Sequence, residues 1–176
     1  VCADDPGAAR LAEEATQDGL QVLRYGVEAA DCDYWTQAMD ARTAGFAFSV
    51  EFQDDHLTEV ELQVPGLHNV QNALAALAVA HQCGLDVQAA AQTLSQFHGA
   101  GRRFEVLGTA AGVTMINDYG HHPTEIRATL QAARQRFPGQ TIWAVWQPHT
   151  YSRTQLLFDA FVRAFDQADH VVVTEV

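Results

Sequence analysis

The 176-residue chain is 48% hydrophobic, which is enough apolar material for one or two buried cores without disulfide support. Its formal net charge of −12 excludes an extended surface for nucleic acid or anionic membranes, because phosphate groups require a field of Lys and Arg. All ten Lys and Arg positions are arginine, so the chain contains no GxxxxGK[ST] phosphate loop.

Three cysteines, Cys2, Cys32 and Cys83, lie far apart in the sequence. They form neither a metal knuckle nor a CxxC pair, and an odd number does not suit a disulfide framework. We therefore expect a protein of the reducing cytoplasm. The longest apolar run, residues 73–80, is far shorter than the about 20 residues of a membrane span.

The first part of the chain is expected to mix helix and strand. Residues 1–3 read as the end of a strand, and Asp4-Asp5-Pro6-Gly7 as a turn that caps a helix over residues 8–17, ended by Gly19. Alternating apolar residues then predict strands. These are expected at 21–25, 34–39, 45–52 and 57–64, with a hairpin turn at 54–56.

Two helices and a glycine-rich hinge follow. The run of Ala, Leu and Val over residues 67–83 predicts a helix buried on most sides and ended by Gly84. Asp86 is expected to cap a second helix over 87–97. His98-Gly99-Ala100-Gly101 is the best candidate for a domain boundary, because two glycines directly follow an apolar helix.

Strands and helices alternate beyond this boundary. We expect a hairpin of strands 103–108 and 113–117, a buried strand at 141–146 and a last strand at 170–174; helices are predicted over 123–136 and 152–168. Such alternation is typical of an α/β domain with a mostly parallel sheet.

Four patches carry chemistry, and the first two are amides and arginines. Asn69 and Asn72 are three residues apart at a helix start, so their carboxamides share a face and suit the edge of a base such as adenine; helix capping is the alternative. Arg102 and Arg103 stand beside the hinge. Paired guanidiniums can fork onto phosphate oxygens, although an ion pair with Glu105 is equally open.

The third patch, Asn117 to Glu125, lies where a strand is expected to pass into a helix. Asp118, His121 and His122 suggest acid/base work, substrate hydrogen bonding or metal ligation. A zinc site with His149 is disfavoured, because neither HxH nor HExxH spacing occurs. His122 is expected only to support the turn.

The fourth patch, Trp146 to Thr154, also follows a strand and precedes a helix. If the two strands are neighbours in the sheet, both turns lie side by side at its carboxyl edge, where ligands gather. Arg153 would then hold a carboxylate, while His149 and His121 flank the reacting centre. A solvated Arg153 with Ser152 as helix cap is the alternative.

These patches together resemble the Mur ligase family, and most closely its alanine-adding members. The resemblance rests on Gly66-Leu67-His68-Asn69-Val70-Gln71-Asn72, Gly101-Arg102-Arg103-Phe104-Glu105, Asp118-Tyr119-Gly120-His121-His122-Pro123-Thr124-Glu125 and Gln147-Pro148-His149 with Tyr151, Arg153 and Thr154. It is strong from Gly66 onward and looser before it. Thr150, Asn117 and Trp146 depart from the arginine, aspartate and phenylalanine usual there.

The resemblance implies a fold and a reaction. Residues 1–99 would be the end of a central ATPase domain, and residues 100–176 an incomplete Rossmann-like C-terminal domain that binds the amino acid. The family reaction uses ATP and Mg²⁺ to phosphorylate the lactyl carboxylate of UDP-N-acetylmuramate, and the amine of L-alanine attacks the acyl phosphate in peptidoglycan synthesis. Because the phosphate loop and main Mg²⁺ ligands are missing, the fragment alone is expected to be inactive.

The resemblance also implies roles for single residues. Asn69, Asn72, Arg103 and Asp118 would contact the nucleotide, whereas Tyr119, His121, His149 and Arg153 would surround alanine and the muramoyl lactate; Arg103 and His121 are the catalytic candidates. Two alternatives stay open. One is a ligase that recycles murein tripeptide onto the same sugar, and the other is a stand-alone nucleotide-binding or regulatory module.

Overall fold

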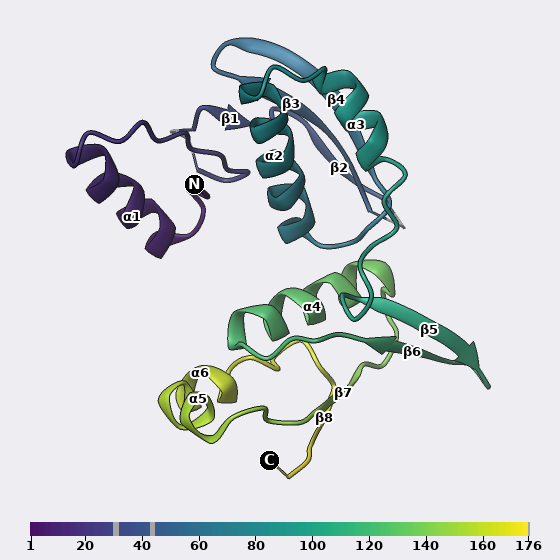
Figure 1. The fold of residues 1–176 in the computed structure, drawn as a ribbon. Helices are drawn as coiled ribbons and strands as arrows, with labels where there is room; N and C mark the ends of the chain where they lie inside the picture. The colour runs from purple at the N-terminus through teal and green to yellow at the C-terminus, as the bar shows by residue number, and fades with distance from the viewer. Residues whose placement is uncertain (30–31, 43–44, 176) are drawn as a thin grey trace. The chain divides into compact units, whose positions relative to one another are not determined.

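The structure, a computed structural model, describes residues 1–29, 32–42 and 45–175. The chain divides into two compact units, Val1–His98 and Gly99–Val176, and each is described by itself (Figure 1). The division falls at the glycine-rich segment that the sequence singled out as a hinge.

The first unit begins with helix α1, Pro6–Gln17. The Asp5 side chain caps it by accepting a hydrogen bond from the Ala8 amide at 2.7 Å. The helix starts two residues earlier than predicted, because proline fits the first helical turn. The strand expected at 21–25 is wrong: this segment makes only isolated bridges, which join Tyr25 to Cys2 and Tyr34.

A four-stranded antiparallel sheet forms the centre of this unit. It comprises β1 (Tyr34–Trp35), β2 (Met39–Ala41), β3 (Phe46–Phe52) and β4 (Asp55–Leu62), and β3 pairs with each of the others. The single strand predicted at 34–39 is therefore two short strands. The β3–β4 turn lies at residues 53–54, one residue before the predicted position.

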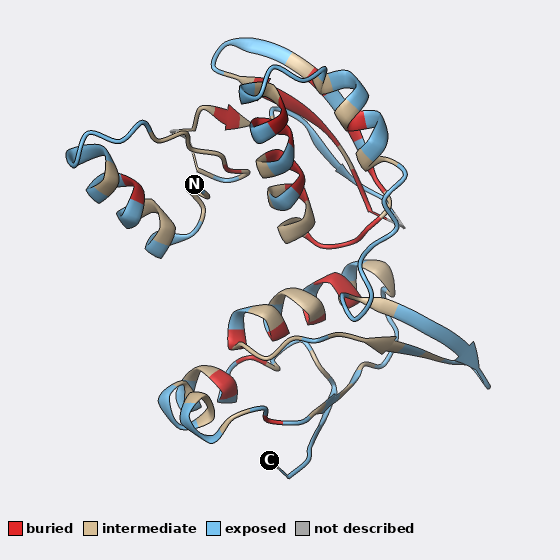
Figure 2. Ribbon diagram, in the orientation of Figure 1, coloured by how far each residue is buried: buried red, intermediate tan, exposed pale blue. Residues whose placement is uncertain are grey.

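Helices α2 (Leu67–Gln82) and α3 (Val87–Leu94) cover one face of the sheet. The buried stripe of α2 faces β3 and β4 (Figure 2). Alternate residues of the strands meet it, as a pleated strand requires. The core comprises Phe46, Phe48, Val50, Val60, Leu62, Val64, Val70, Ala73, Leu74, Leu77 and Ala91.

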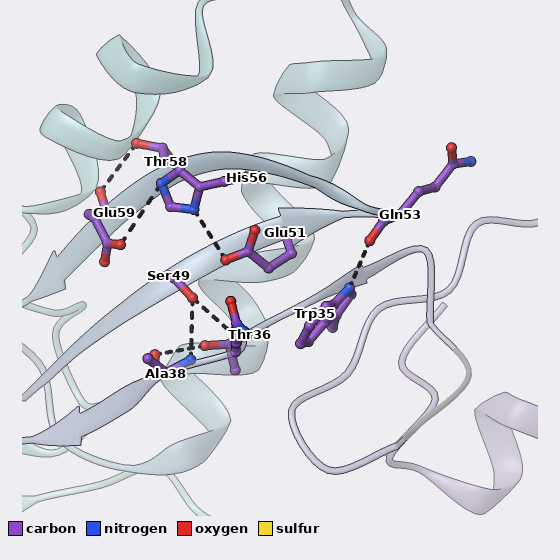
Figure 3. A network of polar contacts seen from close by, with 10 residues as sticks. Trp35, Thr36, Ala38, Ser49, Glu51, Gln53, His56, Thr58 and Glu59 are labelled. Carbon is purple, nitrogen blue, oxygen red and sulfur yellow. Dashed lines mark hydrogen bonds and ion pairs between the residues drawn. The ribbon is translucent and has the colours of Figure 1, made fainter.

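A polar network occupies the other face of β3 (Figure 3). Ser49 and Glu51 alternate with the core residues and are nonetheless buried. The Ser49 hydroxyl accepts hydrogen bonds from the amides of Gln37 and Ala38 at 3.2 and 3.3 Å, and Glu51 Oε1 contacts His56 Nδ1 at 3.1 Å. These partners offset the cost of burying polar groups.

The second unit carries two small sheets. Strands β5 (Glu105–Ala110) and β6 (Val113–Asn117) form an antiparallel hairpin, and β7 (Trp143–Trp146) pairs in parallel with β8 (His170–Val173). Helix α4 (Pro123–Arg136) has the predicted bounds. The α/β class is thus confirmed, with the β7–β8 pair as its parallel part.

Two expectations for this unit are wrong. The segment 152–168 is not one helix, because Leu157 at φ −109° ends α5 (Tyr151–Leu156) and precedes α6 (Phe158–Val162). Strand β7 is not buried on both faces, since Trp143 and Val145 are 63% and 71% exposed. Its other face joins a core of Ile126, Leu130, Phe161 and Ala164 through Ile142, Ala144 and Trp146.

Among the helices that the structure describes, none is long and apolar enough to cross a membrane.

Candidate functional site

The start of α4 organises the polar cluster that the sequence predicts. His122 is the N-cap and accepts a hydrogen bond from the Thr124 amide at 3.3 Å, and Pro123 occupies the first turn. The Glu125 side chain reaches back to accept from the amides of His121 and His122 at 2.9 and 3.2 Å. This capping box fixes the turn that follows β6, and it gives His122 the supporting role expected of it.

Three aromatic rings from two separate turns meet next to this helix start. The Tyr119 and His121 ring centroids are 5.1 Å apart, and that of His149 lies 6.1 Å from His121 and 6.5 Å from Tyr119. The turns after β6 and β7 therefore lie together, although those strands are unpaired in the described structure. A cavity of about 850 Å³ is lined by residues of β6, α4 and β7, and Asp118 forms part of its wall.

Arg103 joins this cluster through Glu125. Its Nη1 lies 3.5 Å from Glu125 Oε1, and His121 Nδ1 lies 3.5 Å from Glu125 Oε2. Partial burial acts to raise the pKa of Glu125, but the His121 amide and the charges of His121 and Arg103 outweigh it and hold that pKa below its ordinary value. The sequence assigned Glu125 no role of its own in the third patch, although its place at the third helical position was a signal for a capping box.

Asp118 braces the backbone of the site. Its Oδ2 accepts from the Phe104 amide at 2.8 Å, and its Oδ1 from the Gly120 amide at 2.7 Å. The Tyr119 amide donates to the Arg102 carbonyl at 2.8 Å. A carboxylate has about four acceptor positions, so two remain for a ligand. The expected nucleotide contact is compatible with this second, structural role.

The bend that Asp118 holds is strained. Arg102 and Phe104 have φ of 59° and 49°, a left-handed conformation that costs residues with a side chain about 1–2 kcal/mol each. Such strain persists where surrounding contacts over-determine the backbone, often at functional sites. Arg103 is the residue between the two.

Arg153 lies in the first turn of α5 and has an unusual guanidinium. Its Nη1 is buried and has no hydrogen-bond partner among the described residues. An unsatisfied buried donor on a charged group is costly. The side chain as a whole is of intermediate exposure, and an anionic ligand that accepts from Nη1 would remove this cost.

Asn69 and Asn72 belong to the Val1–His98 unit, whereas the six other predicted site residues belong to the Gly99–Val176 unit. The Asn69 Nδ2 donates to the Pro65 carbonyl at 2.6 Å, which ties the first turn of α2 to the residue before it. Asn69 is not the helix cap, because the N-cap is Gly66 and no side-chain cap hydrogen bond is formed there among the described residues. Asn72 is exposed one turn further along α2.

No group of three or more His, Cys, Asp or Glu side chains within the described ranges is placed to hold a metal ion. Within these ranges Asp118, His121 and His149 are therefore not grouped as the ligands of a zinc site.

Known proteins share both halves of this chain. Residues 1–80 match the Mur ligase middle domain, and residues 102–176 match the Mur ligase glutamate ligase domain. UDP-N-acetylmuramate--L-alanine ligases from Desulforamulus reducens and Halorhodospira halophila are 42% and 44% identical over the whole chain. The chain spans 37% and 36% of their respective lengths.

Solved structures give the same family. The UDP-N-acetylmuramate-alanine ligase of Thermotoga maritima is 34% identical with a TM-score of 0.77 over 94% of this chain and 36% of its own. The murein peptide ligase of Psychrobacter arcticus is 30% identical with a TM-score of 0.66 over 92% of this chain and 34% of its own. The fold, the clustered turns and these likenesses together show that the chain belongs to the Mur ligase family.

Proposed function

We propose that this chain is part of an ATP-dependent ligase that joins L-alanine to UDP-N-acetylmuramate in peptidoglycan synthesis. The observation that carries the proposal is the single cluster of Arg103, Glu125, His121, Tyr119 and His149. It unites the arginine expected at the nucleotide phosphates with the rings expected around the amino acid and the sugar acid. The names of the relatives supply the substrates.

The residues in the cluster suit transfer through an acyl phosphate. Formation and breakdown of this intermediate depend mostly on positioning and on neutralising negative charge. Arg103 supplies a fixed positive charge, and Arg153 offers a buried donor to a carboxylate or phosphate. His121 and His149 stand where an imidazole can bind the incoming amine or relay its proton. ATP and Mg²⁺ would supply the activating phosphoryl group.

We assign residues 1–99 to the central ATP-binding domain and residues 100–176 to part of the amino-acid-binding domain. The domain matches and the division of the chain at His98 support this assignment. Asn69 and Asn72 are the proposed adenine contacts of the first unit, and Arg103 is the proposed phosphate contact of the second. A cytoplasmic location agrees with the odd number and wide spacing of Cys2, Cys32 and Cys83 in the sequence.

The test uses the natural full-length protein that contains this chain. Phosphate release from ATP is measured with UDP-N-acetylmuramate together with either L-alanine or murein tripeptide. Release that depends on alanine supports the proposal. Release with the tripeptide but not with alanine establishes the recycling ligase instead. The likeness to the murein peptide ligase is the reason for testing this alternative. Release with neither substrate refutes both.

The 176-residue chain by itself is expected to release no phosphate, because the sequence contains no lysine for a phosphate loop. Calorimetry with ATP tests the stand-alone module. Submicromolar binding of ATP by the isolated chain would favour that module, whereas weak or absent binding agrees with a ligase part.

A further inference from the structure

The two oxygens of Glu125 have different partners. Oε2 accepts the hydrogen bonds of the His121 and His122 amides and thereby closes the start of α4. Oε1 faces Arg103 Nη1 at 3.5 Å, and the His121 ring lies 3.5 Å from Oε2. One side chain therefore joins a helix start, a guanidinium and an imidazole.

Hydrogen bonds fix the backbone on both sides of Arg103, so the conformation of its side chain is what can still vary. Phe104 is held by Asp118, and the Arg102 carbonyl is held by the Tyr119 amide. The Arg103 side chain is 53% exposed, and a long exposed arginine samples many rotamers that binding must freeze. Glu125 is the charged partner that restricts them before a ligand arrives.

We propose that Glu125 is a positioning residue, which holds Arg103 and His121 at one carboxylate so that the phosphate-binding and amino-acid-binding sides of the site keep a fixed spacing. This inference rests on the proposed function for its catalytic consequence. The restraint of Arg103 by Glu125 does not depend on which substrate the ligase uses.

Glu125→Gln separates the capping of α4 from the ion pair with Arg103. The amide oxygen of glutamine still accepts at the helix start, but its neutral amide no longer attracts Arg103. In the full-length enzyme the KM for ATP is expected to rise about fivefold, with kcat changed less than about twofold, because ground-state placement of the phosphate ligand is lost.

His122→Ala is the matched control. It removes the other half of the capping box, the acceptor for the Thr124 amide, whereas the carboxylate that pairs with Arg103 belongs to Glu125. It is expected to lower the melting temperature while leaving the KM for ATP unchanged. In an Arg103→Ala background, Glu125→Gln is expected to have no further effect on that KM.

A readout on the isolated chain separates failure of this inference from failure of the proposed function. The Nη hydrogens of Arg103, which face Glu125 Oε1, are expected to exchange with solvent more slowly than those of Arg102 by NMR, and Glu125→Gln should abolish the difference. Equal exchange in the unsubstituted chain overturns the inference whatever the ligase assay gives. So does an unchanged KM for ATP in Glu125→Gln, or an equal rise in the Arg103→Ala background.

Discussion

At the scale of single residues, Asp4 holds three segments of the first unit together. Its carboxylate accepts from the amides of Val27, Glu28 and Ala29 at 2.8, 3.0 and 2.8 Å, and from Gln71 Nε2 at 2.9 Å. Burial acts to raise its pKa, but these hydrogen bonds outweigh burial and hold the pKa below 3.8. The turn before α1 is thereby tied to the first turns of α2.

Asp4→Asn is expected to destabilise the chain by about 1–2 kcal/mol at pH 7, because hydrogen bonds to a charged acceptor are lost. A carboxylate with a lowered folded pKa stabilises above its unfolded pKa, near 3.8, and loses that contribution as the pH falls through the folded value. The difference between variant and parent should therefore shrink below about pH 4. Urea unfolding at several pH values measures it.

Asp5→Asn is the control for this charge change, since asparagine caps a helix about as well as aspartate and, among the described residues, the Asp5 side chain accepts at the start of α1. It should leave stability nearly unchanged at pH 7. A difference for Asp4→Asn that stays constant down to pH 2 would contradict the assigned role of the charge.

Arg153 makes a prediction about substrate binding. Arg153→Lys retains a positive charge but removes the planar fork whose buried Nη1 awaits an acceptor. In the full-length enzyme the KM for UDP-N-acetylmuramate is expected to rise about tenfold or more, equivalent to about 1.4 kcal/mol, with the KM for ATP unchanged. Arg163→Lys, at an exposed position, is the control. Equal changes in both Michaelis constants would rule out a specific contact with the sugar acid.

At the scale of secondary-structure elements, the β5–β6 hairpin turns through Ala111 and Gly112, both with positive φ (50° and 79°). A two-residue turn of this kind favours Asn-Gly, whereas alanine is strained there. Ala111→Asn is expected to stabilise the second unit by about 1 kcal/mol. Thermal unfolding measures the gain, and Ala110→Asn, inside β5, should instead destabilise. A loss of stability in Ala111→Asn would disprove the strain.

Elements with strong local signals were predictable from sequence. Helix α4 has the expected bounds because Pro123 starts it and His122 and Glu125 cap it. Helix α2 ends as predicted, with Gly84 at φ 71° just beyond it. In both cases the residues that begin or end the helix act on their own backbone, so no distant contact has to be known.

Elements whose bounds or burial depend on packing were not predictable from sequence. The pattern of residues 152–168 gives no sign of the break at Leu157, which packs against the core of the second unit. Strand β7 is apolar throughout, yet Trp143 and Val145 on one face stay 63% and 71% exposed, and the ring of Trp143 lies 4.2 Å from that of His170 in β8. Tertiary contacts decide both outcomes, and local propensity does not encode them.

The candidate site shows the same division. Polar residues after two strands predicted that the His121 and His149 turns would meet, and their rings do lie 6.1 Å apart. The two turns were expected to meet if their strands are neighbours in one sheet. In the described structure β6 and β7 are not paired, so the turns meet without that pairing. The link from Arg103 to Glu125 spans 22 positions in the sequence, and no periodicity indicates it.

At the scale of the whole molecule, each unit has its own core. Leu74 lies in the cluster of the Val1–His98 unit and Leu130 in that of the Gly99–Val176 unit, and the two clusters share no residue. The candidate nucleotide contacts are divided in the same way, with Asn69 and Asn72 in the first unit and Arg103 in the second. Each unit should therefore be able to lose its core packing while the other retains it.

Leu74→Ala and Leu130→Ala test this independence. Each removes a buried side chain, 0% and 7% exposed, and should destabilise its own unit by about 3 kcal/mol. Amide signals of the 176-residue chain, followed by NMR on heating, are expected to disappear early only in the substituted unit. Val79→Ala and Leu156→Ala, at positions 63% and 83% exposed, are matched controls that should shift neither transition. If either core substitution lowers both transitions equally, the two units unfold as one, and their separate cores do not make them separate folding units.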